Sequence, residues 1–273
     1  MTPLRANRAA LLAVLAGGAA VVAVAVAVRA HGGAAPAVAR AADVGARFAD
    51  RLPAAPRPAF EPRRPRLLDH SASRSRYAPV LRAATAYEEP DAGSPAAGRL
   101  DATTIDGTTN IALVTGETRR NGDLWVRVRL AEQPDNRVGW VPRSALGGYE
   151  FVHTRLVVDR ARFLALLYVD GKLVFRAPVG IGRPDAPTPH GEFYVVDRLD
   201  GFGNPFYGPV AFGTSARSPT LTDWPGGGVI GIHGTNDPGL IPGRISHGCI
   251  RMRNADILRL KRLLPIGTPL TIL

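Results

Sequence analysis

The segment SHGCIRM, residues 246 to 252, contains the only cysteine of the chain, Cys249, two residues after His247. In an extended segment, residues i and i+2 project to the same face, so the thiol and the imidazole can meet locally. A thiol attacks as the thiolate, and its ordinary pKa of about 8.5 leaves few thiols ionised at neutral pH. A neighbouring imidazole that accepts the proton removes this limit. The pattern indicates a cysteine nucleophile with His247 as its base.

Two further residues fit the same chemistry. Gly248 leaves room for a substrate and permits unusual backbone dihedrals, and we expect the amides of Gly248 and Cys249 to face a developing oxyanion. His233 ends an apolar segment in GIHGTN, and the Gly- and Pro-rich residues 235–245 can return the chain to it. His233 is therefore a candidate second imidazole, catalytic or substrate-orienting, although a lone histidine at a strand end is more often structural.

The same residues allow two other interpretations. His233, His247 and Cys249 could supply three zinc ligands, but the spacing His-Gly-Cys is not that of a usual zinc site and no second cysteine follows. Alternatively, Cys249 is a buried structural thiol, because free cysteine is among the most buried residue types. An intramolecular disulfide is excluded, because the chain has one cysteine.

The elements that must position these residues are predicted to be strands. Two apolar runs, 163–169 and 172–179, flank Asp170-Gly171, which is a strong hairpin signal. One convincing helix is predicted, capped by Asn254 and ended by Pro265. Residues 200–228 are rich in Gly and Pro and lack periodicity, so we expect a long loop that forms a wall or lid over the site.

These motifs resemble, in order, the catalytic signature of the L,D-transpeptidases. GIHGTN followed by SHGCIRMRNAD matches its centre, and YVDGKLVFRAPVGIG with PTPHGEFYV resembles the opening of the same domain. The resemblance covers residues 151–273 and implies an all-β fold, an L,D-transpeptidase-type β-sandwich with one minor helix. It implies that Cys249 is the acylated nucleophile, His247 its base and Gly248 a support of the dyad, that Ser246 and His233 line the site, and that Arg251 and Asn254 brace the catalytic loop.

The resemblance implies acyl transfer on peptidoglycan. The thiolate would attack the carbonyl after the third residue of a donor tetrapeptide stem and release the terminal D-alanine. A side-chain amine of an acceptor stem would then resolve the thioester into a 3-3 cross-link. Inhibition by carbapenems is expected, and no metal or organic cofactor is needed. Two alternatives stay open: an L,D-carboxypeptidase or cysteine peptidase of the cell wall, and a non-catalytic wall-binding protein.

A second module is expected at residues 76–147. Apolar residues alternate with Trp and Arg over 124–130, which is typical of a half-buried strand. Short strands separated by turns predict a small β-barrel. DLWVRVRL and GWVPRSAL, with an earlier RAATAYEEPDA, resemble the bacterial Src-homology-3-like domain of cell-wall proteins. Tyr87 and Trp125 would either line a peptide groove or belong to the core of a spacer domain.

The N-terminal part is predicted to be an anchor and a linker. Residues 9–28 carry no charge and follow Arg5 and Arg8, and a helix of 20 residues is about 30 Å long, enough to cross the hydrocarbon core. We expect residues 1–29 to be a signal anchor, with cleavage at a small-residue site as the alternative. The preceding arginines favour a single-pass membrane protein with its catalytic domain outside the cytoplasm. Residues 30–75, rich in Ala, Pro and Arg, are expected to be an extended spacer.

The charge distribution argues against nucleic-acid binding. The net charge is +11, but residues 1–82 hold 13 arginines against four acidic residues and so account for +9. The remaining residues are nearly neutral. A nucleic-acid reader should gather basic residues on a folded face, so we expect no nucleic-acid partner.

Overall fold

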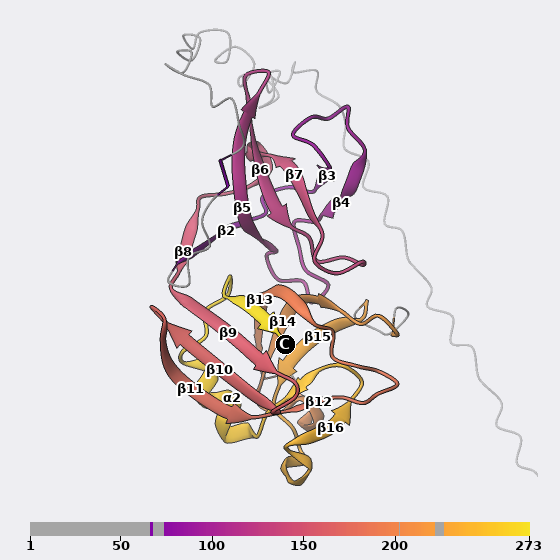
Figure 1. Cartoon of the computed structure of the whole chain (residues 1–273), viewed down its shortest axis with the longest axis vertical. Coiled ribbons are helices and arrows are strands. Elements are labelled where there is room, and N and C mark those ends of the chain that lie inside the picture. The colour runs from indigo at the N-terminus through magenta and orange to yellow at the C-terminus, as the bar shows by residue number, and fades with distance from the viewer. Residues whose placement is uncertain (1–65, 68–73, 202, 222–226) are drawn as a thin grey trace, which may run out of the picture. The chain divides into compact units, whose positions relative to one another are not determined.

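The computed structural model describes residues 66–67, 74–201, 203–221 and 227–273 (Figure 1). Residues Pro58–Leu273 belong to one compact unit, which contains two β-sheets. The predicted anchor at 1–29 and nearly all of the linker at 30–75 lie outside the described residues. Within the described part, no helix has the length and hydropathy required to span a bilayer.

The first sheet contains eight strands in the order β4-β3-β7-β6-β5-β2-β8, with β1 paired to β5. All its strand pairs are antiparallel, and its core is formed by small and β-branched side chains such as Val114, Val126 and Val128. The assignment to the Src-homology-3-like family stays a prediction. The strands are β1 (Arg66–Leu67), β2 (Ser75–Pro79), β3 (Ala84–Tyr87), β4 (Ala96–Leu100), β5 (Ile111–Arg120), β6 (Asp123–Arg129), β7 (Val138–Pro142) and β8 (Glu150–Val152), with a 3-10 turn at Arg143–Ala145.

Trp125 belongs to the interior of this sheet. Its side chain is 6% exposed and packs edge-on against Tyr87, with 6.0 Å between the ring centroids. An aromatic that lines an open peptide groove would present more of its surface to solvent. For Trp125, the burial therefore favours the core role over the groove.

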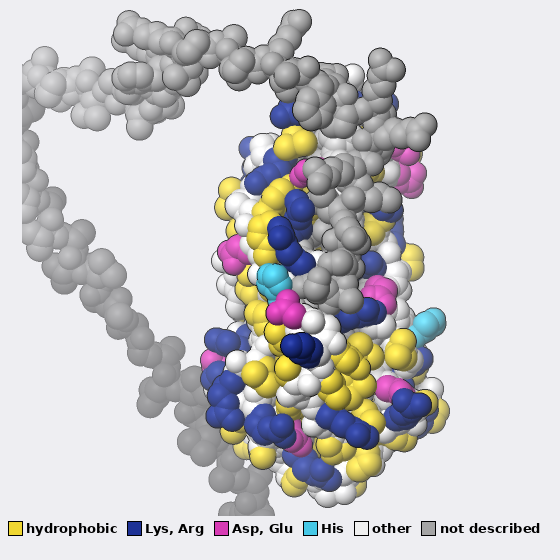
Figure 2. Space-filling model, turned by 60° about the vertical axis from the view of Figure 1, so that its left-hand side comes forward, with side chains coloured by type: hydrophobic (Ala, Val, Ile, Leu, Met, Phe, Trp, Pro, Cys, Tyr) yellow, Lys and Arg dark blue, Asp and Glu magenta, His cyan; other side chains and the backbone are white. Residues whose placement is uncertain are grey.

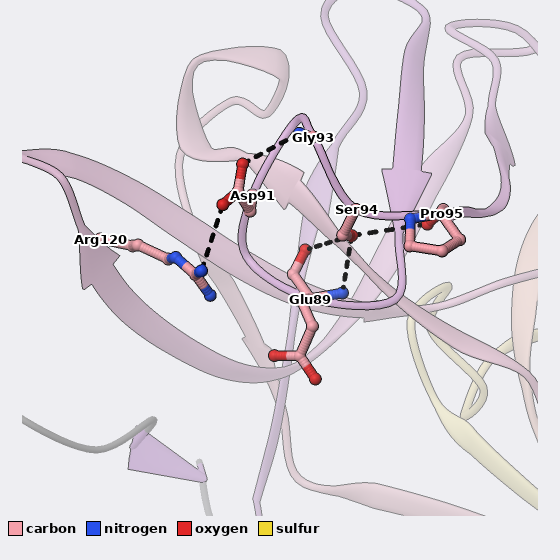
Figure 3. Close-up of polar contacts among 6 residues, drawn as sticks. All are labelled: Glu89, Asp91, Gly93, Ser94, Pro95 and Arg120. Atoms are coloured by element: carbon pink, nitrogen blue, oxygen red, sulfur yellow. Dashed lines mark hydrogen bonds and ion pairs between the residues drawn. The ribbon is translucent and has the colours of Figure 1, made fainter.

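The turn between β3 and β4 is closed by side chains (Figure 3). Asp91 accepts the backbone N–H of Gly93 through Oδ1 at 2.9 Å and forms an ion pair with Arg120 through Oδ2 at 3.1 Å. The hydroxyl of Ser94 accepts the amide of Glu89 at 3.1 Å. Such bonds let short polar residues replace the backbone partners that a strand would supply. The turn is thereby tied to the end of β5.

The second sheet holds ten strands in the order β11-β10-β9-β18-β13-β14-β15-β17-β12-β16. Because β8 pairs with β2 of the first sheet, the second sheet begins only at β9, slightly later than the expected boundary at 151. Its strands are β9 (Thr154–Asp159), β10 (Leu164–Val169), β11 (Lys172–Pro178), β12 (Gly180–Gly182), β13 (Gly191–Asp200), β14 (Val210–Arg217), β15 (Val229–His233), β16 (Gly243–Ser246), β17 (Ile250–Arg251) and β18 (Pro269–Ile272).

The second sheet folds around a single core. The first residues of β13 pair with β18 and its later residues pair with β14, so β13 joins the two halves of the sheet. Helix α2 (Asn254–Lys261) contributes Ile257 and Leu260 to the same core as both halves. The described residues are thus mostly β-structure with one α-helix, as the sequence predicted.

Two local predictions had different outcomes. The hairpin at Asp170-Gly171 is confirmed: β10 and β11 are antiparallel, and both turn residues have positive φ, 49° and 76°. The predicted long loop at 200–228 is wrong, because Val210–Arg217 forms β14 within it. Six of the eight residues of β14 are buried, which removes the alternation by which a strand is recognised.

Side chains of a loop in the first sheet form hydrogen bonds with the backbone of the second sheet. In the loop between β6 and β7, Asp135 accepts the backbone N–H of Arg217 and Gln133 donates to its carbonyl, both at 3.0 Å. Asn136 accepts the amide of Glu192 at 2.7 Å. These contacts hold the end of β14 and the start of β13. We call residues 133–136 the docking loop.

Basic side chains are dispersed on the face of the molecule that Figure 2 shows. On the face in Figure 2, Lys and Arg side chains alternate with hydrophobic and acidic ones. Several arginines are already paired with acids, as Arg99 is with Asp101 and Arg183 with Asp185. This face therefore lacks the continuous basic stripe that would follow a phosphate backbone.

We predict that the double substitution Gln133→Ala and Asp135→Ala lowers the free energy of unfolding by about 1 to 3 kcal/mol, because it leaves both backbone groups of Arg217 without their partners. Urea denaturation followed by tryptophan fluorescence measures the change. Asp123→Ala, an exposed change at the start of β6, is the matched control. Equal urea midpoints for the double variant and the control would contradict a stabilising role of the docking loop.

Candidate active site

Two parallel strands bring Cys249 and His233 together. Strand β15 pairs with β17 so that Ile232 lies opposite Ile250 and His233 opposite Arg251. This register places Gly231 beside Cys249, and the Gly231 amide donates to the Cys249 Sγ at 3.4 Å. A Cβ atom built on Gly231 would lie 3.9 Å from Sγ and 4.0 Å from Cδ2 of His233. The thiol and the buried imidazole therefore flank the open space left by a glycine.

A cavity of about 140 Å³ opens over these groups. Five of the seven sequence-predicted site residues line it: His233, Ser246, His247, Cys249 and Arg251. The other two, Gly248 and Asn254, support the site from outside the cavity lining.

The walls of the cavity come from the two ends of the segment predicted as one long loop. Phe206 and Tyr207, in the 3-10 turn Pro205–Tyr207 before β14, form one part of the lining, and Ser218 and Leu221 after β14 form another. The expected wall thus exists as two short segments that β14 separates. The wall after β14 begins next to Arg217, the residue held by the docking loop.

His233 is buried and has a defined tautomer. The residue is 2% exposed, and its Nδ1 lies 2.6 Å from the carbonyl oxygen of Gly234. Because a carbonyl can only accept, Nδ1 carries the hydrogen and the neutral ring keeps Nε2 as an acceptor. The ring of Tyr207 packs at 5.0 Å and that of Phe206 at 6.1 Å between centroids.

The pKa of His233 is lowered to about 4. Burial is the main cause, and the positive charge of Arg251 adds to it, while the hydrogen bond to Gly234 acts in the opposite direction. The imidazole is consequently neutral at physiological pH and can accept a proton.

Burial also raises the pKa of the Cys249 thiol above its ordinary range. The Gly231 amide and the Arg251 charge oppose this effect without overcoming it. The resting pair is therefore a neutral thiol and a neutral imidazole. In such a site the proton moves during attack on the substrate, because no thiolate is stored beforehand.

His247, the base expected from the sequence, has a different environment. Its side chain is exposed and belongs to the part of the cavity lining that meets solvent. Proximity in sequence to Cys249 therefore does not give His247 the burial that His233 has.

The turn that carries Cys249 is braced by two hydroxyl groups. Ser246 donates to the Cys249 carbonyl at 2.6 Å and accepts the Gly248 amide at 3.1 Å. Thr188, buried behind the turn, donates to the Gly248 carbonyl at 2.6 Å and accepts the Gly182 amide at 2.8 Å. The expected oxyanion role of the Gly248 amide is therefore wrong for this geometry, because the Ser246 hydroxyl already binds it.

Gly248 is required by its conformation. Its φ is +116°, which side-chain-bearing residues rarely adopt, and a Cβ there would lie 2.7 Å from Cδ1 of Ile230. The support of the dyad by Gly248 stays a prediction. In the sequence, the feature that indicated this requirement was the glycine between His247 and Cys249.

Asn254 does not cap helix α2 through its side chain. The helix begins at Asn254, with Arg253 at the N-cap position, and no side-chain cap bond forms. Instead, Oδ1 of Asn254 accepts the backbone N–H of Thr235 at 2.9 Å. A local capping rule predicted the wrong partner, but the bond ties the helix start to the segment after His233.

Sequence reasoning missed Gly231, Phe206 and Tyr207. Gly231 lies two residues before His233 on the same strand, and the aromatic pair lies in NPFYG, between the turn-forming residues of the predicted loop. An aromatic pair in a Gly- and Pro-rich segment was the available signal. Its contact with His233 could be recognised only in the folded chain.

The zinc interpretation requires a cluster of ligating side chains. In the part of the chain that the structure describes, no group of three or more His, Cys, Asp or Glu side chains is arranged to hold a metal ion. His233, His247 and Cys249 share the cavity without forming such a group.

The residues of the second sheet are similar to a known protein family. Residues 153–272 match the family model of the YkuD-type L,D-transpeptidase catalytic domain. The matched region is less than half of the chain and contains the whole cavity lining.

Two curated relatives carry L,D-transpeptidase in their names. The chain is 38% identical to YkuD of Bacillus licheniformis over 106 residues, 39% of this chain and 57% of the relative. It is 34% identical to YqjB of Bacillus subtilis over 121 residues, 41% of this chain and 66% of the relative. The chain thus spans just over half of the length of YkuD.

A solved structure, the catalytic domain of an L,D-transpeptidase from Enterococcus faecium, is also similar. The identity is 26%, the match covers 44% of this chain and 96% of that one, and the TM-score is 0.34.

We predict that alkylation of Cys249 by iodoacetamide accelerates only as the pH rises beyond the ordinary thiol range, because burial holds the thiol protonated at neutral pH. The rate is measured by intact mass over the range from about pH 5 to about pH 10.5, which brackets the ordinary thiol pKa. Cys249→Ala must show no labelling, since Cys249 is the only cysteine. A rate plateau already reached in mildly acidic solution would instead reveal a stored thiolate.

Proposed function

We propose that this protein is a cell-wall L,D-transpeptidase in which Cys249 forms a thioester with a peptidoglycan stem. The observation that carries the proposal is that one cavity holds a protonated thiol, on the residue just before β17, and a buried, neutral imidazole, at the end of the neighbouring strand β15. The match of residues 153–272 to the catalytic domain of this family supports the same reaction. The arrangement supplies a nucleophile and a base within the chain itself.

Acylation proceeds by transfer of the thiol proton to Nε2 of His233 as Sγ attacks the carbonyl carbon of the third stem residue. The tetrahedral intermediate collapses when the carbon–nitrogen bond to D-alanine breaks. The imidazolium returns its proton to the departing amine, which leaves a thioester on Cys249 and neutral His233.

Transfer to the acceptor reverses the first step, with the amine of a second stem in place of the amine of D-alanine. The side-chain amine of a second stem attacks the thioester carbonyl, and His233 takes the proton that the amine loses. The thiolate leaves and recovers that proton from the imidazolium. The product is a 3-3 cross-link, and the enzyme returns to its neutral resting pair.

We assign the base to His233 because it has the properties that proton transfer requires. Its tautomer is fixed by the Gly234 carbonyl, and its low pKa keeps it unprotonated. His247, exposed at the same cavity, is the alternative base suggested by the sequence. Its role in this proposal is to contact the bound stem.

The expected location follows from the reaction. Stem peptides lie outside the cytoplasm, so an anchor at residues 1–29 would hold the enzyme in the cell membrane beside its substrate. The linker at 30–75 would give the catalytic domain reach, and a Src-homology-3-like module at 76–147 is compatible with work at the wall.

The decisive experiment compares His233→Gln, His247→Gln and Cys249→Ala with the wild type on a disaccharide-tetrapeptide, with products followed by mass spectrometry. We expect the wild-type enzyme to form a thioester and a dimer, and the Cys249→Ala sample measures the background that does not depend on the thiol. We expect His233→Gln to lose about 10² to 10⁴-fold in kcat, the usual worth of a general base, and His247→Gln to lose less than about tenfold.

The remaining outcomes contradict the proposal in distinct ways. The opposite order of the two histidine variants would move the base to His247. Tripeptide alone, at every amine concentration, would indicate an L,D-carboxypeptidase. If neither a stem nor a carbapenem formed an adduct with wild-type Cys249, the protein would instead be a non-catalytic wall-binding protein.

We predict that Gly231→Ala lowers kcat/KM by about 10- to 100-fold while the protein stays folded, because the methyl group enters the space between Sγ and the imidazole at ordinary contact distances. Steady-state kinetics and thermal denaturation measure both effects. Gly148→Ala, where a Cβ meets nothing within 4 Å, is the control. Unchanged kinetics for Gly231→Ala would show that proton transfer does not cross this space.

A further inference from the structure

The guanidinium group of Arg251 is buried and forms no ion pair among the described residues, although the negative charge of the exposed Asp237 acts on it from a longer distance. The residue is 8% exposed, and its Nε is buried without any hydrogen-bond partner. Its contact is with the face of Phe206, with Cζ at 4.3 Å from the ring centroid. Buried charges in proteins are normally paired and hydrogen-bonded, because desolvation of a lone ion is costly. The described part of the chain therefore places no anion in direct contact with this guanidinium group.

The guanidinium group of Arg251 lies on the same side of the chain as the thiol of Cys249. Arg251 lies two residues after Cys249 in an extended segment, so both side chains project to one face about 6.6 Å apart along the strand. Both line the same cavity. An anionic group bound by Arg251 would consequently lie within one or two residue lengths of the atom that Sγ attacks.

We propose that Arg251 binds the terminal carboxylate of the donor stem, on the D-alanine that leaves during acylation; this rests on the proposed function. In a tetrapeptide stem, that carboxylate follows the reacting carbonyl by one residue, about 3.5 Å. A guanidinium presents paired N–H donors that match the two oxygens of a carboxylate. The unused donors of Arg251 fit this partner, and the match places the scissile carbonyl at Cys249.

This assignment makes Arg251 a specificity-determining residue. A stem whose terminal carboxylate is amidated offers no negative charge to the guanidinium. A stem longer by one residue places its carboxylate one residue farther from the thiol. Both should react poorly with the wild-type enzyme, because the buried cation would remain unpaired in the complex.

The test compares two donors, the tetrapeptide with a free carboxylate and the same peptide ending in D-alaninamide, on full-length wild type, Arg251→Lys and Arg251→Gln. We expect the wild type to prefer the free carboxylate by about 100-fold in kcat/KM, the scale on which a buried charged pair discriminates. The preference should fall below about threefold in Arg251→Gln, chiefly through KM for the free acid. Arg251→Lys should be intermediate, because it keeps the charge and loses the paired donors.

Arg244→Gln is the matched control, since Arg244 is an exposed arginine of β16 outside the cavity lining and should keep the full preference. Thermal denaturation confirms that each variant is folded. If Arg251→Gln lost activity on both donors equally and kept the preference, Arg251 would be structural and the inference overturned.

A third donor, amidated on a stem carboxylate other than the terminal one, shows which carboxylate Arg251 binds. We expect the ratio of kcat/KM for the unmodified peptide to kcat/KM for this third donor to be the same in Arg251→Gln as in the wild type. If Arg251→Gln lost that ratio instead, the assignment of Arg251 to the terminal carboxylate would be overturned. Failure of the wild type to acylate with any donor would refute the proposed function, whereas an active wild type with an unchanged preference in Arg251→Gln refutes only this inference.

Discussion

The parallel pairing of β15 with β17 is the constraint on which the site depends. It sets Gly231 beside Cys249 and His233 beside Arg251, and in a parallel ladder aligned residues share a face. A slip of the β17 segment by one residue would turn Cys249 and Arg251 toward the core and bring Ile250 into the cavity. The register is fixed because both isoleucines are fully buried in the core on the opposite face.

Several polar contacts hold this pair of strands in place. Thr188 and Ser246 fix the turn before β17, and Asn254 fixes the segment after β15. The docking loop holds Arg217, where the wall of the cavity leaves β14. The first sheet therefore contributes to the shape of the catalytic cavity through backbone contacts, in addition to any ligand that it binds itself.

The sequence predicted local features better than tertiary ones. The hairpin at Asp170-Gly171 and the helix after Arg253 follow from short-range rules, and both form. Strand β14 escaped prediction because burial of both faces removes its alternation. The i, i+2 spacing favours His247 as the base, whereas the proposal for His233 rests on burial beside β17, which only the pairing of β15 with β17 creates. Asn254 satisfied the capping rule in sequence but found a tertiary partner.

The charges of the site explain why its resting state is neutral. Burial disfavours both the thiolate of Cys249 and the imidazolium of His233, and the positive charge of Arg251 favours the first and disfavours the second. A carboxylate bound at Arg251 would cancel much of that charge. Because Arg251 lowers the pKa of both groups, the pKa of the His233 imidazole and that of the Cys249 thiol would both rise, while burial would remain the main cause of each shift. The bound carboxylate would therefore keep the resting thiol neutral, and the proton would still move only as Sγ attacks the substrate carbonyl.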